Sequence, residues 1–222
     1  MNRWKPERGL LGATAAVAAG VTGGVVLTDG ARESGDLSAF DPGVTTDFIS
    51  ARSDIDTVVA HVFTFLGSTT ALLPLTVALL VLLCVRRRLR AAGAVALGMS
   101  MSLALTVLLK DTIQRLRPPS ADMLGVIETG FAFPSGHTLN GSVFYGLVTG
   151  LLLTVCSATW ARVAVVAGGV SMALGIGLSR VYRGFHWLTD VMAGWSIAAA
   201  VLGAVVLIVM LFDSFRSSVA RS

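Results

Sequence analysis

The chain has 222 residues, of which 54% are apolar and 14% are charged, and its formal net charge is +4. A soluble domain of this length could not cover so much apolar surface, and long apolar blocks are typical of membrane proteins. The basic residues lie at the ends of these blocks, which argues against a nucleic-acid-binding protein. Cys84 and Cys156 each close an apolar block, and two cysteines predict neither a disulfide framework nor a metal site.

Six segments have the length and composition of membrane-spanning helices. Such a helix needs about 20 apolar residues to cross roughly 30 Å of hydrocarbon. The segments are residues 9–27, 58–85, 91–109, 138–156, 163–178 and 187–212. We therefore expect an all-α bundle of six transmembrane helices, with residues 1–222 forming a single integral-membrane domain.

The first segment has a basic start and an apolar core, so a signal peptide is the alternative to a transmembrane helix. No convincing cleavage site of small residues precedes Asp29, which favours a retained helix. The segment also contains Gly20-x3-Gly24, a pattern of close helix packing. Packing within the monomer explains this pattern at least as well as dimerisation does, so the oligomeric state stays open.

Lysines and arginines gather in every second connection along the chain, and this alternation sets the expected orientation. They are Arg3, Lys5, Arg8, Arg86, Arg87, Arg88, Arg90, Arg162, Arg216 and Arg221. By the positive-inside rule these connections face the cytoplasm, so we expect both termini there in a multi-pass protein of the cell membrane. The extracytoplasmic side then holds the polar stretch 29–56, for which a surface amphipathic helix and a solvated loop are both open.

Three short sequence blocks on that same side carry the candidate chemistry. The first, KDTIQRLRP, covers residues 110–118. Lys110 and Arg117 are seven residues apart, so a helix that continued through the block would place both on one face. Such cations are often anchors at the membrane surface, and Arg115 fits that role.

The second block, FPSGH, stands directly before an apolar segment at residues 133–137. Ser135 is a good N-cap, and Gly136 allows a ligand to approach the backbone closely. The free N–H groups at the start of a helix bind anions, and His137 adds a titratable group at the same place.

The third block, SRVYRGFHWLTD, covers residues 179–190. His186 and Asp190 are four residues apart, which on a helix places them on one face. A carboxylate that holds the Nδ1–H of an imidazole leaves its Nε2 free to act as a nucleophile. His61 has no such neighbours in the sequence, and we interpret it as a packing or loop-facing residue.

Together the blocks resemble the three-part signature of the type-2 phosphatidic acid phosphatase superfamily, K-x6-R-P, P-S-G-H and S-R-x5-H-x3-D. All eleven fixed positions are filled in order. The chain is similar to the bacterial membrane branch, which includes phosphatidylglycerophosphate and undecaprenyl pyrophosphate phosphatases. The resemblance implies a lipid phosphatase with its active site at the extracytoplasmic membrane surface.

The resemblance also implies a role for each motif residue. His186 attacks phosphorus and becomes a phosphohistidine, Asp190 orients it, and His137 protonates the leaving oxygen. The phosphate oxygens are held by a separate set, namely Lys110, Arg117, Ser135, Gly136 and Arg180. Fixed cations and a helix end can stabilise phosphoryl transfer, so we expect no metal and no cofactor.

Several alternatives stay open from the sequence. The expected partners are membrane lipids and a lipid phosphate or pyrophosphate, with polyprenyl (undecaprenyl) pyrophosphate the best candidate because the site faces outward. Phosphatidylglycerophosphate and phosphatidic acid are the other candidates, and residues 119–132 form the loop in which we expect substrate selection. A vanadium-dependent haloperoxidase is disfavoured by six spans. A non-catalytic lipid binder or transporter is disfavoured by the complete set His137, His186 and Asp190.

Overall fold

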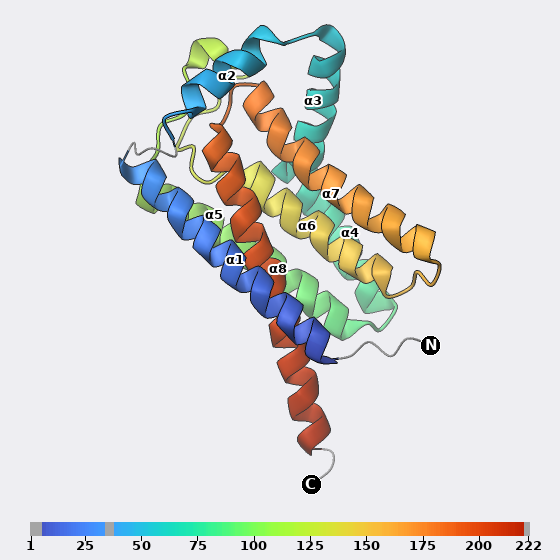
Figure 1. Ribbon diagram of the computed structural model, residues 1–222. Helices are drawn as coiled ribbons and strands as arrows, with labels where there is room; N and C mark the ends of the chain where they lie inside the picture. The colour runs from blue at the N-terminus through green and yellow to red at the C-terminus, as the bar shows by residue number, and fades with distance from the viewer. Residues whose placement is uncertain (1–5, 34–37, 220–222) are drawn as a thin grey trace.

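The computed structural model describes residues 6–33 and 38–219, and the regular elements within these ranges are helices (Figure 1). Arg3, Lys5 and Arg221, three of the basic residues used for the orientation, lie outside the described residues. In chain order the helices are α1 Pro6–Glu33, α2 Asp41–Ser50, α3 Asp54–Gly67, α4 Thr69–Val85, α5 Leu89–Ile113, the 3-10 turn η1 Ser120–Asp122, α6 Gly136–Leu153, α7 Thr159–Tyr182 and α8 Leu188–Val219.

The expected all-helical fold is confirmed, and the described helices supply four or five candidate spans where the sequence predicted six. By length and composition, α1, α5, α7 and α8 can each cross a membrane, over Gly9–Ala31, Leu89–Ile113, Thr159–Tyr182 and Leu188–Ser217. A fifth span results if α3 and α4 are counted as one broken helix. α6 has 18 residues, and it does not meet the same criterion on its own.

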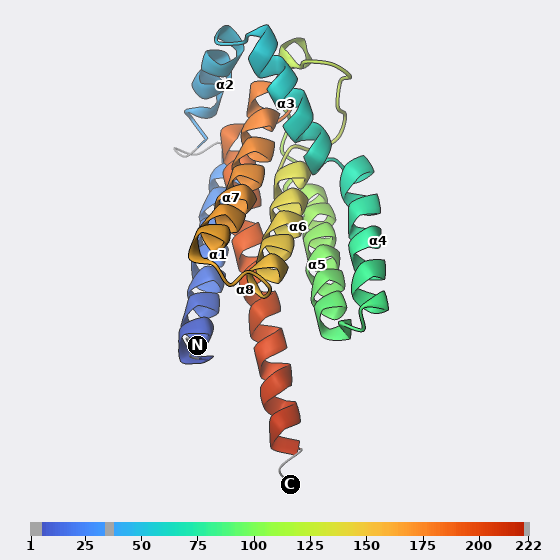
Figure 2. The same cartoon turned by 90° about the vertical axis from the view of Figure 1, so that its right-hand side faces the viewer.

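The predicted span at residues 58–85 is divided into α3 and α4, which are bent by 48° at their junction (Figure 2). Ser68 is the residue at the break. Its side chain accepts a hydrogen bond from the backbone N–H of Ala71 at 3.2 Å, so Ser68 ends α3 and caps α4. An apolar run therefore contains a helix break because one polar residue can satisfy the free N–H groups of the next helix.

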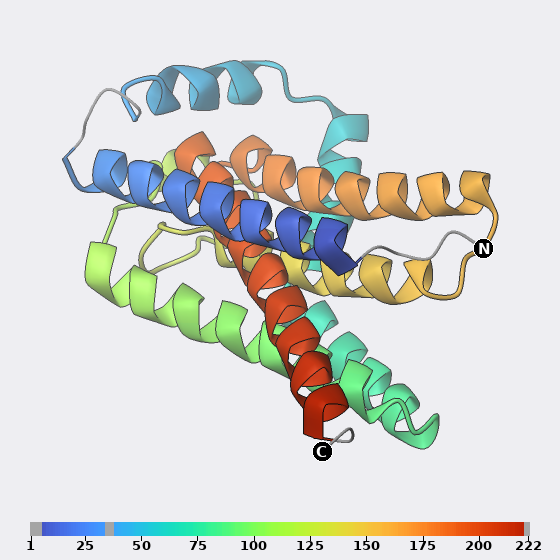
Figure 3. The same ribbon diagram turned by 60° about the horizontal axis from the view of Figure 1, so that its bottom comes forward.

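The glycines of α1 pack this helix against α8, which it crosses (Figure 3). A Cβ atom at Gly20 would lie 2.5 Å from the carbonyl oxygen of Ser196, and one at Gly24 would lie 3.3 Å from Ile197. Glycine at position 20 therefore permits close contact of the two backbones. The Gly20-x3-Gly24 pattern serves packing within this chain.

One of the clusters that form the apolar core lies between α6 and α8. Leu139 and Val143 of α6 are fully buried against Ala198 and Val201 of α8. Most outward faces of α3, α4, α5 and α7 expose large apolar side chains instead, as expected for helices that face lipid. The well-packed α6–α8 contact supports the ends of both helices, where two of the three motif blocks lie.

The bundle has two distinct ends (Figures 1 and 2). One end carries α2, the segment between α5 and α6, and the junction between α7 and α8. The other end carries the start of α1, the end of α8, the turn before α5, which contains Arg88, and the first turn of α7, which contains Arg162. The predicted separation of the motif blocks from these basic turns is therefore present, whichever side of a membrane each end faces.

The polar stretch 29–56 contains a helix, α2, where a surface helix and a solvated loop were both open. α2 lies across the end of the bundle (Figure 1). Asp41 and Thr45 are buried on its inner side. α2 is thus part of the support for the motif blocks.

Candidate active site

The three blocks converge at this end of the bundle, around the short connection between α7 and α8. Lys110 lies in the last turn of α5, His137 is the second residue of α6, and Arg180 lies in the last turn of α7. Arg117 reaches the same place from the loop after α5. A single cavity is lined by five of the eight predicted site residues, namely Lys110, Arg117, Gly136, His137 and His186. Ser135, Arg180 and Asp190 do not line it.

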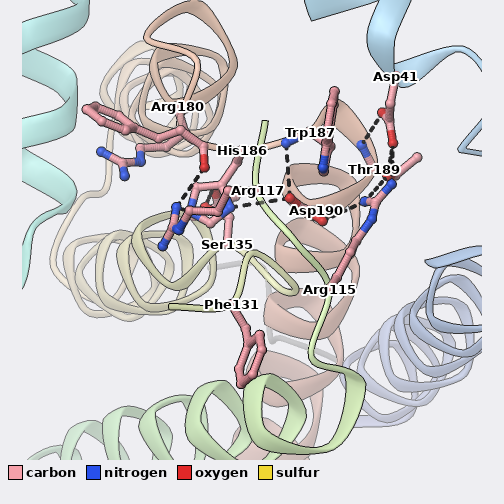
Figure 4. A network of polar contacts seen from close by, with 12 residues as sticks. Asp41, Arg115, Arg117, Phe131, Ser135, Arg180, His186, Trp187, Thr189 and Asp190 are labelled. Atoms are coloured by element: carbon pink, nitrogen blue, oxygen red, sulfur yellow. Dashed lines mark hydrogen bonds and ion pairs between the residues drawn. The ribbon is translucent and has the colours of Figure 1, made fainter. Parts of the chain in front are cut away.

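His186 lies between α7 and α8 with its imidazole fully enclosed. Nδ1 lies 3.4 Å from Oδ2 of Asp190, and Nε2 lies 3.2 Å from Nη1 of Arg117 (Figure 4). A guanidinium can only donate, so Nε2 must accept, which assigns the proton to Nδ1. Burial and the cations Arg180, Arg117 and Lys110 hold the pKa of His186 well below its ordinary 6.5. The ring is therefore neutral near pH 7, with an electron pair on Nε2.

Neither motif pair lies on one continuous helix, which was the condition for a shared helix face. α5 ends at Ile113, because Gln114 adopts a left-handed conformation (φ 54°), so Arg117 does not share a helix face with Lys110. α8 begins only at Leu188, so His186 precedes the helix on which Asp190 lies. Asp190 still reaches the ring, and its Oδ2 also accepts the backbone N–H of Trp187 at 3.0 Å.

The sequence pattern does not reveal the role of Arg115, which it describes only as fitting a membrane anchor. Its Nη1 donates to Oδ1 of Asp190 at 2.6 Å, and its Nη2 donates to Oδ2 of Asp41 at 2.7 Å (Figure 4). Asp41 in turn accepts both the hydroxyl and the backbone N–H of Thr189. Both carboxylates are almost completely buried. Arg115 therefore fixes the carboxylate that contacts His186, and no signal in a single sequence identified Asp41 as its partner.

On the Nε2 side, arginines gather around a carboxylate from the loop 119–132. Arg180 is fully buried, and its Nη2 donates to Oε1 of Glu128, while Arg117 lies 3.1 Å from Oε2. Nε and Nη1 of Arg180 are buried without a hydrogen-bond partner in the described part of the chain. A buried cation with unused donors is costly, so this arrangement favours an anionic ligand.

The other residues expected to hold phosphate contact neighbouring parts of the protein. Nζ of Lys110 donates to the carbonyl of Phe131. Ser135 occupies the N-cap position of α6, but its hydroxyl accepts from Thr138 at 2.9 Å rather than from a backbone N–H. Gly136 lines the cavity, and a Cβ atom there would lie 3.1 Å from Thr106 of α5. Gly136 therefore permits close packing of α6 on α5 beside the cavity, and its contact with a ligand remains a prediction.

The cavity has a volume of about 430 Å³ and extends from the charged residues between α4, α5 and α6. Its far part is mainly apolar, with lining residues that include Leu72, Leu73, Met99 and Leu103. A charged end and an apolar end in one cavity match a ligand with both kinds of surface.

The other candidate ligand residues of the sequence do not form a second site in the described part of the chain. Within residues 6–33 and 38–219, no three side chains of His, Cys, Asp or Glu cluster as metal ligands would. The metal-free expectation remains a prediction. His61 is exposed on α3 and does not line the cavity. Cys84 and Cys156 are both free thiols.

Comparisons with known proteins identify the family of this chain. The model of the PAP2 superfamily matches residues 91–213. Phosphatidylglycerophosphatase B of Bacillus subtilis is 34% identical over 137 residues, or 60% of this chain. An undecaprenyl-diphosphatase of Sulfolobus acidocaldarius is 42% identical over 71 residues, or 32% of this chain. These alignments span 66% and 30% of the relatives' own lengths, so the first covers just under two thirds of its relative.

Two solved structures share the fold. The transmembrane PAP2-type phosphatidylglycerolphosphate phosphatase of Bacillus subtilis superposes with a TM-score of 0.76 at 26% identity, over 88% of this chain and 96% of that one. LpxE of Aquifex aeolicus, at 22% identity, superposes with a TM-score of 0.60 over 77% of this chain and 96% of that one. Because the family model covers more than half of the chain, including all three blocks, this multi-pass helical protein belongs to the PAP2 superfamily.

Proposed function

We propose that this protein is a lipid phosphate phosphatase that works through a phosphohistidine on His186. The observation that carries the proposal is the state of this ring. Its Nε2 is unprotonated and directed toward Arg117, beside the buried Arg180 with its unused donors. A nucleophile and an anion site therefore share one small space.

The residues suggest two chemical steps. In the first, Nε2 of His186 bonds to phosphorus while the bond from phosphorus to the leaving oxygen breaks, and a protonated His137 supplies a proton to that oxygen. Burial and the nearby Arg180 lower the pKa of His137 to about 3, so the negative charge of the bound substrate must raise this pKa for the step to proceed. In the second, water attacks the phosphorus of the phosphohistidine and passes a proton to His137, the N–P bond breaks, and inorganic phosphate leaves, which restores both histidines. Arg117, Arg180 and Lys110 stabilise the charge on the phosphoryl oxygens, and Asp190 stabilises the cationic ring. No step in this account requires a metal.

The apolar part of the cavity supports a lipid as the substrate. It leads from His186 between α4, α5 and α6, with Leu72 and Leu103 on its walls. A hydrocarbon chain placed there would leave water, which contributes about 0.8 kcal/mol per buried methylene. A soluble phosphate ester would gain nothing from these walls.

The relatives support two substrate classes. An outward-facing site favours a polyprenyl pyrophosphate, and one relative is named an undecaprenyl-diphosphatase. The longer alignment, to a phosphatidylglycerophosphatase B, favours phosphatidylglycerophosphate. We propose the polyprenyl pyrophosphate first, and phosphatidylglycerophosphate is the second candidate.

A substrate panel in detergent tests the function. Purified protein should release inorganic phosphate from at least one of undecaprenyl pyrophosphate, phosphatidylglycerophosphate and phosphatidic acid, both with and without excess EDTA. Activity that is lost with EDTA and restored by Mg²⁺ would refute the metal-free mechanism. Binding of these lipids without any phosphate release would instead identify a lipid binder or transporter.

The proposed orientation has its own test. We propose that the end with the motif blocks faces outward and that both termini lie in the cytoplasm. The turn before α5 and the first turn of α7, which contain Arg88 and Arg162, lie at the opposite end of the bundle. Reporter fusions after Asp41 and Leu124 should report an external position, and fusions after Arg88 and Arg216 an internal one. An internal Leu124 fusion would overturn both the orientation and the preference for the polyprenyl carrier.

A further inference from the structure

Glu128 occupies the place where the proposed phosphate would bind. Both of its carboxylate oxygens are paired, one with Arg180 and one with Arg117. These are two of the cations proposed to hold phosphate. About a third of the Glu128 side chain is exposed, whereas that of Arg180 is fully buried. The carboxylate therefore enters the site from its open side.

Glu128 lies on an arch, residues 125–130, that is anchored at its ends. Before the arch, the carbonyl of Leu124 accepts from Arg183 at 2.7 Å. At its far end, the carbonyl of Gly130 accepts from Arg117 at 3.1 Å. Among residues 126–129, Glu128 is the one whose side chain forms a hydrogen bond or ion pair to the described part of the chain.

Both ends of the arch are glycines, so the backbone dihedral angles there can change at low energetic cost. Gly125 (φ 105°) and Gly130 (φ 88°) both adopt conformations that favour glycine. Val126 and Ile127 between them are exposed, Val126 at 87%. Since neither apolar side chain packs into the bundle, the Glu128 ion pairs are the main interactions that hold the middle of the arch in place.

We propose that Glu128 is a specificity-determining residue. Its carboxylate, tethered by the arch, occupies the phosphate subsite and is displaced only by a terminal phosphate or pyrophosphate. This inference rests on the proposed function and deepens it. When substrate binds, Arg117 and Arg180 exchange the carboxylate for phosphoryl oxygens, and the arch moves outward. The same exchange frees Arg117 from its present partners and opens Nε2 of His186 to phosphorus.

The selectivity follows from charge. A phosphate diester, the head group of bulk anionic lipids, offers one negative charge and two free oxygens, as the carboxylate of Glu128 does. Such a lipid gains nothing in the exchange, while Glu128 is tethered at high effective concentration. A terminal phosphate carries about −1.5 to −2 charges and three oxygens, so it can replace the carboxylate. Burial alone would raise the pKa of Glu128, but attraction by Arg180 and Arg117 outweighs burial and lowers this pKa. The Glu128 carboxylate that competes with phosphate is therefore charged near neutral pH.

The test uses inorganic phosphate as the probe, so it does not depend on turnover. The variant Glu128→Gln keeps the size of the side chain and removes its charge. If Glu128 fills the site in about nine tenths of molecules, this variant should bind phosphate about tenfold more tightly than the wild type. Phosphate should also raise its melting temperature more. The matched control is Asp111→Asn, which removes an equal charge from an exposed position in the last turn of α5. This variant should leave phosphate binding unchanged.

A second arm measures selectivity. In mixed micelles with phosphatidylcholine, phosphatidylglycerol should inhibit turnover by Glu128→Gln and leave the wild type nearly unaffected. If no form of the protein hydrolyses any lipid phosphate, the proposed function fails, while the phosphate-binding comparison still decides the role of Glu128. Equal or weaker phosphate binding by Glu128→Gln would overturn the proposal, because Glu128 would then be a structural partner of the arginines.

A third arm covers the case in which Glu128→Gln fails to fold. A nitroxide attached at Val126→Cys, with Cys84 and Cys156 replaced by serine, reports on the arch while Glu128 is intact. Saturating phosphate or orthovanadate should increase the mobility of the label. An unchanged spectrum at saturation would also overturn the proposal.

Discussion

The two sides of His186 are built differently. On the Nδ1 side, Asp190 and Asp41 are buried and both pair with Arg115, whose side chain is only 12% exposed. On the Nε2 side, Arg117 and Arg180 share one carboxylate, Glu128, whose side chain is 31% exposed. Paired, buried charges resist rearrangement, whereas a surplus of cations beside a mobile acid permits exchange of ligands. The first side holds the ring in one tautomer, and we propose that the second admits the substrate.

The largest effect should come from the ring between the two sides. His186→Ala removes the covalent route, so turnover should fall by about four orders of magnitude or more on every substrate. His137→Ala should depend on the leaving group, because an alkoxide needs a proton more than a lipid monophosphate does. Phosphatidic acid hydrolysis should therefore suffer more than polyprenyl pyrophosphate hydrolysis. Equal losses on both substrates for His137→Ala would show that His137 is not the general acid.

The next largest effect on turnover should come from the Nε2 side of His186. Arg180→Ala removes a buried donor to the phosphoryl group and should lower kcat by about 10²-fold or more, by analogy with the loss of a transition-state donor. Arg183→Ala is the matched control, since Arg183 stacks on the same ring, Phe185, and donates to Leu124 instead of Glu128. Equal losses for the two variants in steady-state kinetics would indicate that packing on Phe185 matters more than phosphate contact.

A smaller effect, on kcat rather than on KM, should come from the Nδ1 side of His186. Asp41→Asn weakens the partner of Arg115 and should lower kcat by about 10- to 100-fold, the range seen when outer partners of functional groups are lost. KM should change little, because Asp41 does not line the cavity. Asp47→Asn, an exposed position on the same helix, serves as the control. A change confined to KM, with normal kcat, would contradict the positioning role.

The smallest effect concerns pH. Nε2 must be unprotonated to attack, and the lowered pKa of His186 keeps it so as the pH falls through 6.5. The acid limb of kcat/KM should therefore follow the second ionisation of the substrate phosphate, with protonation of His186 acting only at lower pH. Profiles between about pH 8 and pH 5, measured with two substrates whose phosphate pKa values differ, separate the two origins. A limb near 6.5 for both substrates would assign it to the enzyme and contradict the pKa shift.

Sequence reasoning identified the fold class and the cluster of motif residues, because apolar block length and motif spacing are local properties. It did not anticipate the break at Ser68, since a helix can end wherever a side chain caps the next one. It also missed Asp41 and Glu128. Both lie far from His186 in sequence, and their importance depends on which arginine each one meets in the folded chain.

The central claim is a covalent intermediate on His186, and trapping it is the most direct test. Substrate labelled with ³²P in its terminal phosphate, mixed with excess enzyme and quenched within milliseconds in alkali, should leave label on the protein. A phosphohistidine is stable to alkali and labile to acid, and peptide mapping should place the label on His186. Label that is absent from His186→Ala and present in Asp111→Asn would support the account. Full single-turnover hydrolysis with no labelled protein at any time, or label on another residue, would contradict it.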